Sequence, residues 1–262
     1  MEMLMQIAYI ILAHKLPNQL MRLIDQLDSP WATFFVHIDQ KTDASIFRQL
    51  SDRFSYRDNI HLLRRFSCYW GGFGVVEATL EGLRQIFLHS PRPDYILLLT
   101  GQDYPLRSNE SIRSYFEQSH GISFIDCEPL PNFKEFPVTG GAHLYEDWHF
   151  ASKRYFHVHL PWVKRILPLA LKPYKGSAYW SLTYECAHYL LTFIERNPQV
   201  VQFFKYVIVP DELIFQTILM NATPAHTVVS DSLRYIDWEG SPDPKHPKLD
   251  FIHLVDKNRK AG

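Results

Sequence analysis

The chain has 262 residues, of which 46% are hydrophobic and 21% charged, a composition typical of a folded protein rather than a disordered one. Lys and Arg number 27 against 28 Asp and Glu, so the net charge of -1 argues against binding nucleic acid through many phosphate contacts. No apolar stretch reaches the roughly 20 residues that span a bilayer, so we expect no transmembrane segment and a cytoplasmic protein.

Three cysteines, Cys68, Cys127 and Cys186, stand far apart in the chain. Their odd number and spacing exclude a disulfide framework and a CxxC metal site. A reducing compartment fits this usage best.

Continuous apolar runs at Ile7 to Leu12, Thr33 to His37 and Tyr95 to Leu99 are typical of strands buried on both faces. Stretches with helical spacing lie between them, and this alternation predicts an α/β fold with a mostly parallel sheet in a single domain. The other expected elements are strands at 60–63, 123–127, 178–182 and 233–238 and helices at 109–118, 162–171, 184–196 and 211–221.

From Glu128 to Pro161 the regular pattern is lost and Pro, Gly, His and aromatic residues accumulate. Irregular stretches longer than about 12 to 15 residues inside a compact chain are usually functional or disordered. The aromatic content favours a packed functional loop.

Candidate ligand-binding residues follow the predicted strands. Asp39 comes directly after the second strand, Gln102 and Asp103 follow the strand at 95–99, and the segment SCYWGGFG leads into the next helix. Ligands of open α/β sheets bind at the carboxyl ends of the strands, so we expect these residues on one rim.

The glycines Gly71, Gly72 and Gly74 precede a helix that carries Glu77. They match neither a P-loop nor a dinucleotide fingerprint, which leaves either a phosphate contact or a tight turn.

Metal binding has weak support in the sequence. No HExxH motif and no DxD pair is present, and loop packing is favoured over zinc ligation for the histidines of the irregular segment. We therefore expect no metal and no cofactor. These histidines are His143, His149, His157 and His159, and the DxE look-alikes of a metal-binding pair are Asp126 with Glu128 and Asp237 with Glu239.

The sequence Pro210-Asp211-Glu212 begins the predicted helix at 211–221. Proline followed by acids is what helix-end electrostatics favours, so this segment has a purely structural interpretation. The alternative is that Glu212 is a general base whose pKa is raised by burial.

Several segments in fixed order resemble the core-2/I-branching family of β-1,6-N-acetylglucosaminyltransferases, which includes the peptide O-xylosyltransferases and bacterial members. LTGQDYPL and VPDE with its following helix are the most specific pieces, and the resemblance runs from Ile7 to about Trp238. The other segments that carry it are AYIILAHK, FFVHIDQKTD, CYWGGFGVVEATLEGLR, GSAYWSLTYECAHYLL and LRYIDW.

The resemblance implies a GT-A-like, nucleotide-sugar-binding α/β fold and inverting transfer from a UDP-sugar to a hydroxyl of a glycan or glycoconjugate, without metal. It implies N-acetylglucosamine or xylose as the sugar and bacterial polysaccharide biosynthesis as the setting. Within the single domain 1–262, residues 1–127 would bind the donor, and residues 128–262 would bind the acceptor and carry the base.

The resemblance also implies roles for individual residues. Glu212 matches the general base. The donor-binding residues would be Asp39, Tyr69, Trp70, Gln102 and Asp103, and the acceptor-binding residues Glu146, Trp148, Trp180 and Trp238.

In the family, basic residues in a C-terminal segment resembling LFARKF hold the diphosphate, and this chain has no such segment after LRYIDW. The substitutes offered here are Arg234, Lys248, Lys257 and Arg259. Two alternatives therefore stay open: a binder of sugar nucleotides or glycans without turnover, and a metal-dependent hydrolase built on the histidines.

Overall fold

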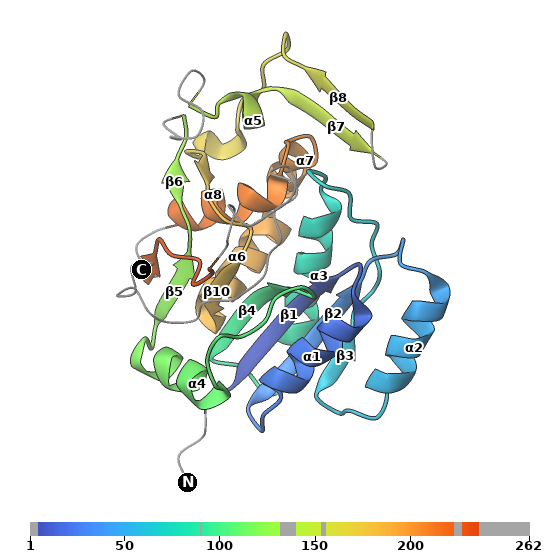
Figure 1. Cartoon of the computed structure of the whole chain (residues 1–262). Coiled ribbons are helices and arrows are strands. Elements are labelled where there is room, and N and C mark those ends of the chain that lie inside the picture. Colours follow the sequence, from blue (N-terminus) through green and yellow to red (C-terminus); the bar gives the residue numbers. More distant parts are fainter. Residues whose placement is uncertain (1–4, 90, 132–139, 153–155, 223–226, 236–262) are drawn as a thin grey trace, which may run out of the picture.

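The computed structural model describes residues 5–89, 91–131, 140–152, 156–222 and 227–235. A seven-stranded sheet forms its centre, in the order β11-β5-β10-β4-β1-β2-β3 (Figure 1). All neighbouring strands are parallel except β10, which is antiparallel to both β4 and β5. The sheet contains β1 (Ile7–Ala13), β2 (Ala32–Ile38), β3 (Ile60–Leu62), β4 (Tyr95–Thr100), β5 (Ile122–Ile125), β10 (Trp180–Thr183) and β11 (Thr227–Val229).

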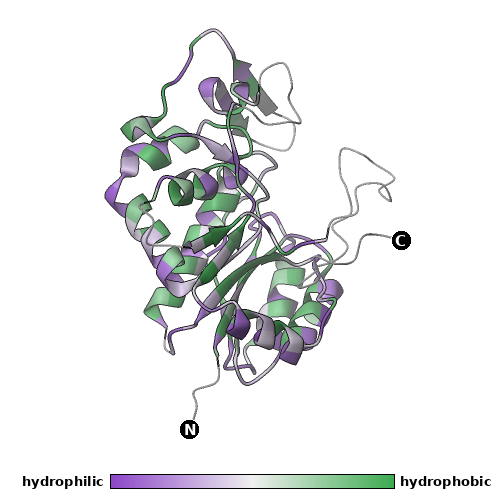
Figure 2. Ribbon diagram, turned by 90° about the vertical axis from the view of Figure 1, so that its left-hand side faces the viewer, coloured by the Kyte–Doolittle hydropathy of each residue, from purple (hydrophilic) through white to green (hydrophobic). Residues whose placement is uncertain are grey.

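Helices cover both faces of the sheet, because alternate side chains of the buried strands point to opposite sides. On β1, Ile10 joins a core with α3, α6 and α8, whereas Ile11 joins a second core with α1, α2 and α4. Figure 2 shows these strands as an apolar layer between the helices. The helices are α1 (Pro17–Leu27), α2 (Ala44–Phe54), α3 (Gly74–Leu88), α4 (Asn109–Gln118), α6 (Tyr184–Arg196), α7 (Pro198–Phe204) and α8 (Ile214–Met220).

The expected α/β class and most expected elements are confirmed, and α4 and α6 have the predicted bounds. Ser108 and Thr183 explain this agreement, because each caps its helix by accepting a hydrogen bond from a backbone N–H in the first turn. In the described part of the chain, no helix is long and apolar enough to cross a membrane.

The stretch predicted to be irregular contains regular structure. A short helix, α5 (His143–Glu146), leads into an antiparallel hairpin of β7 (Trp148–Ser152) and β8 (Phe156–Leu160). This hairpin lies at the end of the molecule opposite the N-terminus (Figure 1). A further pair joins β6 (Glu128–Pro129) to β9 (Tyr174–Lys175).

The predicted helix at 162–171 is wrong. Residues 162 and 163 form a bend, residues 164–167 have no regular structure, and only a 3-10 turn, η1 (Pro168–Ala170), follows. The apolar side chains Trp162 and Ile166 are 83% and 91% exposed. A helix here would therefore gain no stability from packing an apolar face against the core. Arg165 is buried instead and donates to the carbonyls of Phe203 and Tyr206.

Two further predictions are corrected near the end of the described chain. The helix expected at 211–221 is divided into a 3-10 turn, η2 (Pro210–Glu212), and α8, with Leu213 outside helical geometry between them. The strand expected at 233–238 does not form over its described residues 233–235, where Leu233 has a φ of 53° that no strand accommodates. The strand in this region is β11, several residues earlier.

Candidate active site

Glu212 ends the η2 turn, which follows Val209 in a left-handed conformation with φ 46°. Its carboxylate Oε2 lies 2.8 Å from Nζ of Lys175 in β9, and the two side chains are 32% and 11% exposed, respectively. The Gly176 N–H donates to the Glu212 carbonyl over 3.0 Å. Backbone and side-chain contacts thus hold a carboxylate that a ligand can still reach.

Asp211 precedes this carboxylate in the turn. Burial, followed by the neighbouring Glu212 carboxylate, raises the pKa of Asp211 to about 7. Burial and the nearby carboxylates of Asp103 and Asp211 also raise the pKa of Tyr179, so its hydroxyl stays protonated at neutral pH. Tyr179 is therefore close enough to Asp103 and to the turn that carries Glu212 to feel the charges of both.

Asp39 lies at the carboxyl end of β2 and is 2% exposed. It accepts hydrogen bonds from Nζ of Lys41 at 2.7 and 2.9 Å, from the Lys41 backbone N–H at 2.8 Å and from the Cys68 N–H at 3.1 Å. The Lys41 ammonium lies 4.4 Å from the centre of the Tyr69 ring, whereas Trp70 is 77% exposed. Asp39 and Tyr69 therefore both contact the Lys41 ammonium, and the Trp70 ring lies at the surface.

The loops around Asp39 are held by buried polar contacts. The Phe66 N–H donates to Nε2 of His37 over 2.9 Å, and burial lowers the pKa of His37 to about 4, so this imidazole is a neutral acceptor. The Arg65 guanidinium donates to backbone carbonyls from Ile38 to Thr42. The segment after β2 is thus fixed in place before any ligand binds.

The segment 68–74 connects Asp39, which accepts from the Cys68 N–H, to the turn of Glu212. The Val209 N–H donates to the Gly71 carbonyl over 3.2 Å, and a Cβ on Gly71, whose φ is +69°, would lie 2.7 Å from the Ile208 side chain. A Cβ on Gly74 would lie 2.4 Å from the Ser67 carbonyl oxygen. Close packing therefore explains Gly71 and Gly74 as part of a tight turn that contacts the segment leading to Glu212.

Asp103 and Gln102 lie just after β4. The Asp103 carboxylate accepts from the N–H and hydroxyl of Thr100 at 2.8 and 3.1 Å, and burial raises the pKa of Asp103 against the opposing charge of Arg234. Arg234 donates to the Leu98 carbonyl over 2.9 Å and to two carbonyls of its own segment. In the described chain Gln102 Oε1 and Arg234 Nε are buried without a hydrogen-bond partner. This rim therefore offers one hydrogen-bond acceptor and one donor to a ligand.

Glu146 ends α5, and Nζ of Lys164 lies 3.8 Å from its carboxylate. The Arg165 N–H donates to the Glu146 carbonyl over 2.8 Å, and the Arg165 guanidinium lies 4.6 Å from the centre of the Trp148 ring. Trp148 also contacts the ring of Tyr206 at 5.4 Å. Glu146 and Trp148 thus belong to one structural unit at the base of the hairpin.

The structure separates the remaining candidates. Trp180 is fully buried and packs edge-on against Phe215, so its ring belongs to the core and offers no platform to an acceptor at the surface. Four candidates lie outside the described residues, namely Trp238, Lys248, Lys257 and Arg259.

Sequence reasoning missed the two lysines that pair with the site carboxylates. Lys41 stands two residues after Asp39, a spacing that lets a side chain fold back onto the carboxylate. Lys175 is distant in sequence from Glu212, and only the β6–β9 pairing brings it there. The first lysine was therefore open to prediction from the motif, whereas the second needed the tertiary structure.

The chain is similar to known proteins over most of its length. The family profile described as Core-2/I-Branching enzyme matches residues 7–259. Xylosyltransferase 2 of Rattus norvegicus is 24% identical over 97% of this chain, and xylosyltransferase oxt of Drosophila pseudoobscura pseudoobscura is 22% identical over 91%. The chain spans 28% and 26% of the lengths of these two relatives.

Among solved structures, a 4-diphosphocytidyl-2C-methyl-D-erythritolsynthase from Anaerococcus prevotii matches with a TM-score of 0.39 and 14% identity, over 77% of this chain and 83% of that one. The family match covers nearly the whole chain, so the chain belongs to the Core-2/I-Branching enzyme family. The mostly parallel sheet with helices on both faces agrees with the GT-A-like architecture that the resemblance implies.

Proposed function

We propose that this protein is a glycosyltransferase that moves a sugar from a UDP-sugar to a hydroxyl of a glycan or glycoconjugate. Family membership and the xylosyltransferase relatives support the class. One observation carries the mechanism: the reachable Glu212 carboxylate is fixed by Lys175, and its turn is joined through Val209 and Gly71 to the glycine segment, whose Cys68 N–H donates to Asp39.

The donor would bind at the carboxyl ends of the strands, with its uridine and ribose on the side of Asp39 and Tyr69. Asp39 is a buried acceptor of several hydrogen bonds, and Tyr69 offers a ring beside it for a base to stack on. Near the end of β4, Gln102 Oε1 would accept a hydrogen bond from the donor, and Arg234 Nε would donate one to it. N-acetylglucosamine and xylose are the two proposed donor sugars.

Glu212 would act as general base. The acceptor O–H gives its proton to the carboxylate while its oxygen forms a bond to the anomeric carbon, and the bond from that carbon to the UDP diphosphate breaks on the opposite face. This displacement inverts the anomeric centre. Positioned general bases typically contribute about 10² to 10⁴ in rate.

The diphosphate carries negative charge that metal-independent transfer must balance with protein cations. Arg234 is the described candidate, together with Lys248, Lys257 and Arg259. Residues 1–127 supply Asp39 and Tyr69, and residues 128–262 supply Glu212, in line with the proposed donor and acceptor halves.

Binding without turnover is the second candidate function, favoured by the pairing of the described cations. Lys41 is bound to Asp39, Lys175 to Glu212 and Arg234 to backbone carbonyls. If these pairs persist when the donor binds, the leaving diphosphate gains little stabilisation from them.

Calorimetric titration with UDP in the presence of EDTA tests the donor assignment, with GDP and NAD as controls. Selective UDP binding without metal is the expected result, and it would be followed by a donor screen for transfer. Equal binding of GDP, or a strict need for a divalent cation, would contradict the proposed donor site. UDP binding without transfer from any donor would favour the second function.

A further inference from the structure

The β7–β8 hairpin gathers side chains with metal-ligand chemistry, in alternation with the acceptor candidates Glu146 and Trp148. Successive residues of a strand point to opposite faces, so Asp147, just before β7, shares a face with His149 two residues on. His149 pairs directly with His159 on β8, so their side chains are cross-strand neighbours. The pattern D-x-H on one strand and a histidine opposite thus converges on one spot.

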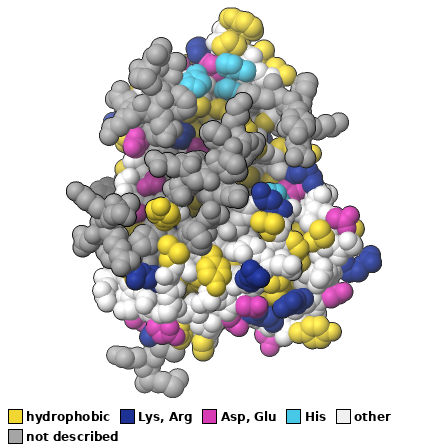
Figure 3. Space-filling model, viewed as in Figure 1, with side chains coloured by type: hydrophobic (Ala, Val, Ile, Leu, Met, Phe, Trp, Pro, Cys, Tyr) yellow, Lys and Arg dark blue, Asp and Glu magenta, His cyan; other side chains and the backbone are white. Residues whose placement is uncertain are grey.

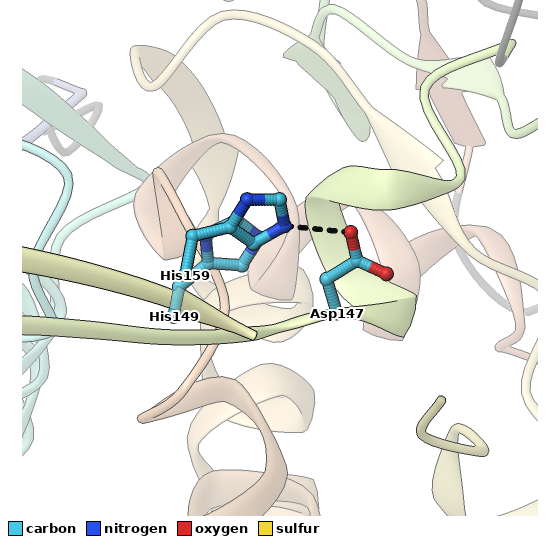
Figure 4. A group of neighbouring side chains, drawn as sticks. All are labelled: Asp147, His149 and His159. Carbon is cyan, nitrogen blue, oxygen red and sulfur yellow. Dashed lines mark hydrogen bonds and ion pairs between the residues drawn. The ribbon is translucent and has the colours of Figure 1, made fainter. Parts of the chain in front are cut away.

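The three side chains lie close together in the structure. One ligand atom from each of Asp147, His149 and His159 lies within 4.8 Å of the other two. The imidazoles stack with their centres 4.6 Å apart, and Nε2 of His159 lies 2.7 Å from Oδ2 of Asp147, as Figure 4 shows. In Figure 3 histidines gather at this end of the molecule, beside acidic and basic side chains.

The surroundings orient these groups and leave a way in. Asp147 and His149 are buried, whereas the His159 side chain is 41% exposed. Nε2 of His149 lies 3.0 Å from the His143 carbonyl oxygen, a backbone contact of the kind that fixes the ring of a metal-binding histidine. Lys164 forms an ion pair with Asp147 at 2.5 Å, but its side chain is 56% exposed. If a metal ion binds Asp147, water can solvate the displaced Lys164 ammonium.

We propose that Asp147, His149 and His159 bind one zinc ion. Two imidazoles with a carboxylate suit zinc and other late divalent metals rather than calcium or magnesium, which prefer all-oxygen sites. Tetrahedral zinc with bonds of about 2.1 Å needs ligand atoms roughly 3.4 Å apart, so side-chain rotations that close the gap by up to about 1.4 Å bring the three ligands into place, with a water molecule as the fourth ligand.

The ion would join both strands of the hairpin to the end of α5, because Asp147 directly follows Glu146 there. The ion is assigned no step in the proposed sugar transfer, and its binding is measured without any sugar substrate, so failure of one proposal leaves the other intact. Its effect would be to hold the hairpin in one position relative to the helical core.

Untagged full-length protein, stripped with a chelator and exchanged into metal-free buffer, tests the site by zinc titration against a chromophoric chelator. We expect one equivalent to bind and to raise the melting temperature. H159A should bind about 100-fold more weakly or worse, and the partly exposed position of His159 favours a folded variant. H149Q serves as a second ligand variant, and circular dichroism checks both folds.

The matched control is H61A, which removes one ring of a described histidine pair whose centres lie 4.3 Å apart elsewhere in the molecule. It should keep full zinc affinity. K164A should bind zinc more tightly than the wild type, because it removes the ammonium that competes for Asp147. If the wild type binds no zinc, or if H159A and K164A match it in affinity, the cluster is a set of hydrogen bonds and ion pairs only, and the proposal is overturned.

Discussion

The Lys175 ammonium lies 2.8 Å from the Glu212 carboxylate, although the two residues come from elements far apart in the chain. Lys175 is nearly buried, whereas Glu212 keeps about a third of its side chain exposed. The buried partner therefore fixes the orientation of the exposed one, which is the arrangement expected where a carboxylate must meet an incoming hydroxyl in one geometry.

Replacing Glu212 by Gln should abolish sugar transfer and leave UDP affinity nearly unchanged. The amide keeps the shape of the side chain but accepts no proton from the acceptor, so we expect kcat to fall by about 10² to 10⁴. Transfer is measured by release of UDP from the donor, and UDP affinity by calorimetry.

The matched control for this variant is E185Q. Glu185 lies on α6 and is an exposed glutamate that forms an ion pair with Arg92. E185Q should retain full activity. Wild-type turnover in E212Q would remove Glu212 from the mechanism.

Replacing Lys175 by Met should lower kcat about 10- to 100-fold while the UDP dissociation constant stays the same. The ammonium acts through Glu212 as a positioning group, so its loss releases the carboxylate without touching the residues proposed to bind the donor. K175R keeps a cation beside Glu212 and should recover part of the activity. A rise in KM alone, or no recovery in K175R, would point to a different role for Lys175.

Replacing Asp39 by Asn should weaken UDP binding about 10- to 100-fold, since hydrogen bonds to a charged group contribute about 1.5 to 3 kcal/mol each. The amide also leaves the Lys41 ammonium without its carboxylate partner. Calorimetry with UDP measures the effect. D43N is the control, because Asp43 is the exposed N-cap of α2 and Asn caps equally well; similar UDP affinity in D39N and wild type would exclude Asp39 as a donor contact.

Sequence patterns predicted the strands and helices of the central sheet layer well, because short local signals in the chain specify these elements. Buried strands such as 95–100 show continuous apolar runs, and helices such as 184–196 begin at a capping residue. The hairpin at 148–160 was missed because its strands are short and their histidines and aromatics give no clean alternation. Its position depends on tertiary contacts, including the His149 N–H donating to the Tyr206 carbonyl.

The candidate site could be predicted from the sequence at positions where a motif directly follows a predicted strand. Asp39 and Asp103 were placed on the rim from the ends of their strands, and both lie there. The sequence placed both Trp148 and Trp180 among the acceptor-binding candidates. Only the structure shows that the Trp180 ring is fully buried and belongs to the core. Lys175 could not be found from local sequence, since the β6–β9 pairing that places it forms between distant segments.

Asp211 should make the stability of the protein fall as the pH rises. Its folded pKa of about 7 lies above the model-compound value of 3.8, so the folded chain binds this proton more tightly than the unfolded chain does. The favourable contribution is complete below about pH 4 and is lost progressively up to about pH 7. At about 1.36 kcal/mol for each pKa unit, the loss has an upper limit of roughly 4 kcal/mol.

D211N cannot ionise, so it should gain stability relative to the wild type between pH 4.5 and pH 8, as measured by urea unfolding at both values. D43N provides the contrast, because hydrogen bonds from Ser45 lower the pKa of Asp43 and its stabilising effect is already complete above about pH 5. The difference between D43N and wild type should therefore stay constant from pH 5 to pH 8. A constant difference for D211N as well would mean that Asp211 ionises normally in the folded protein, and that burial beside Glu212 does not shift its proton affinity.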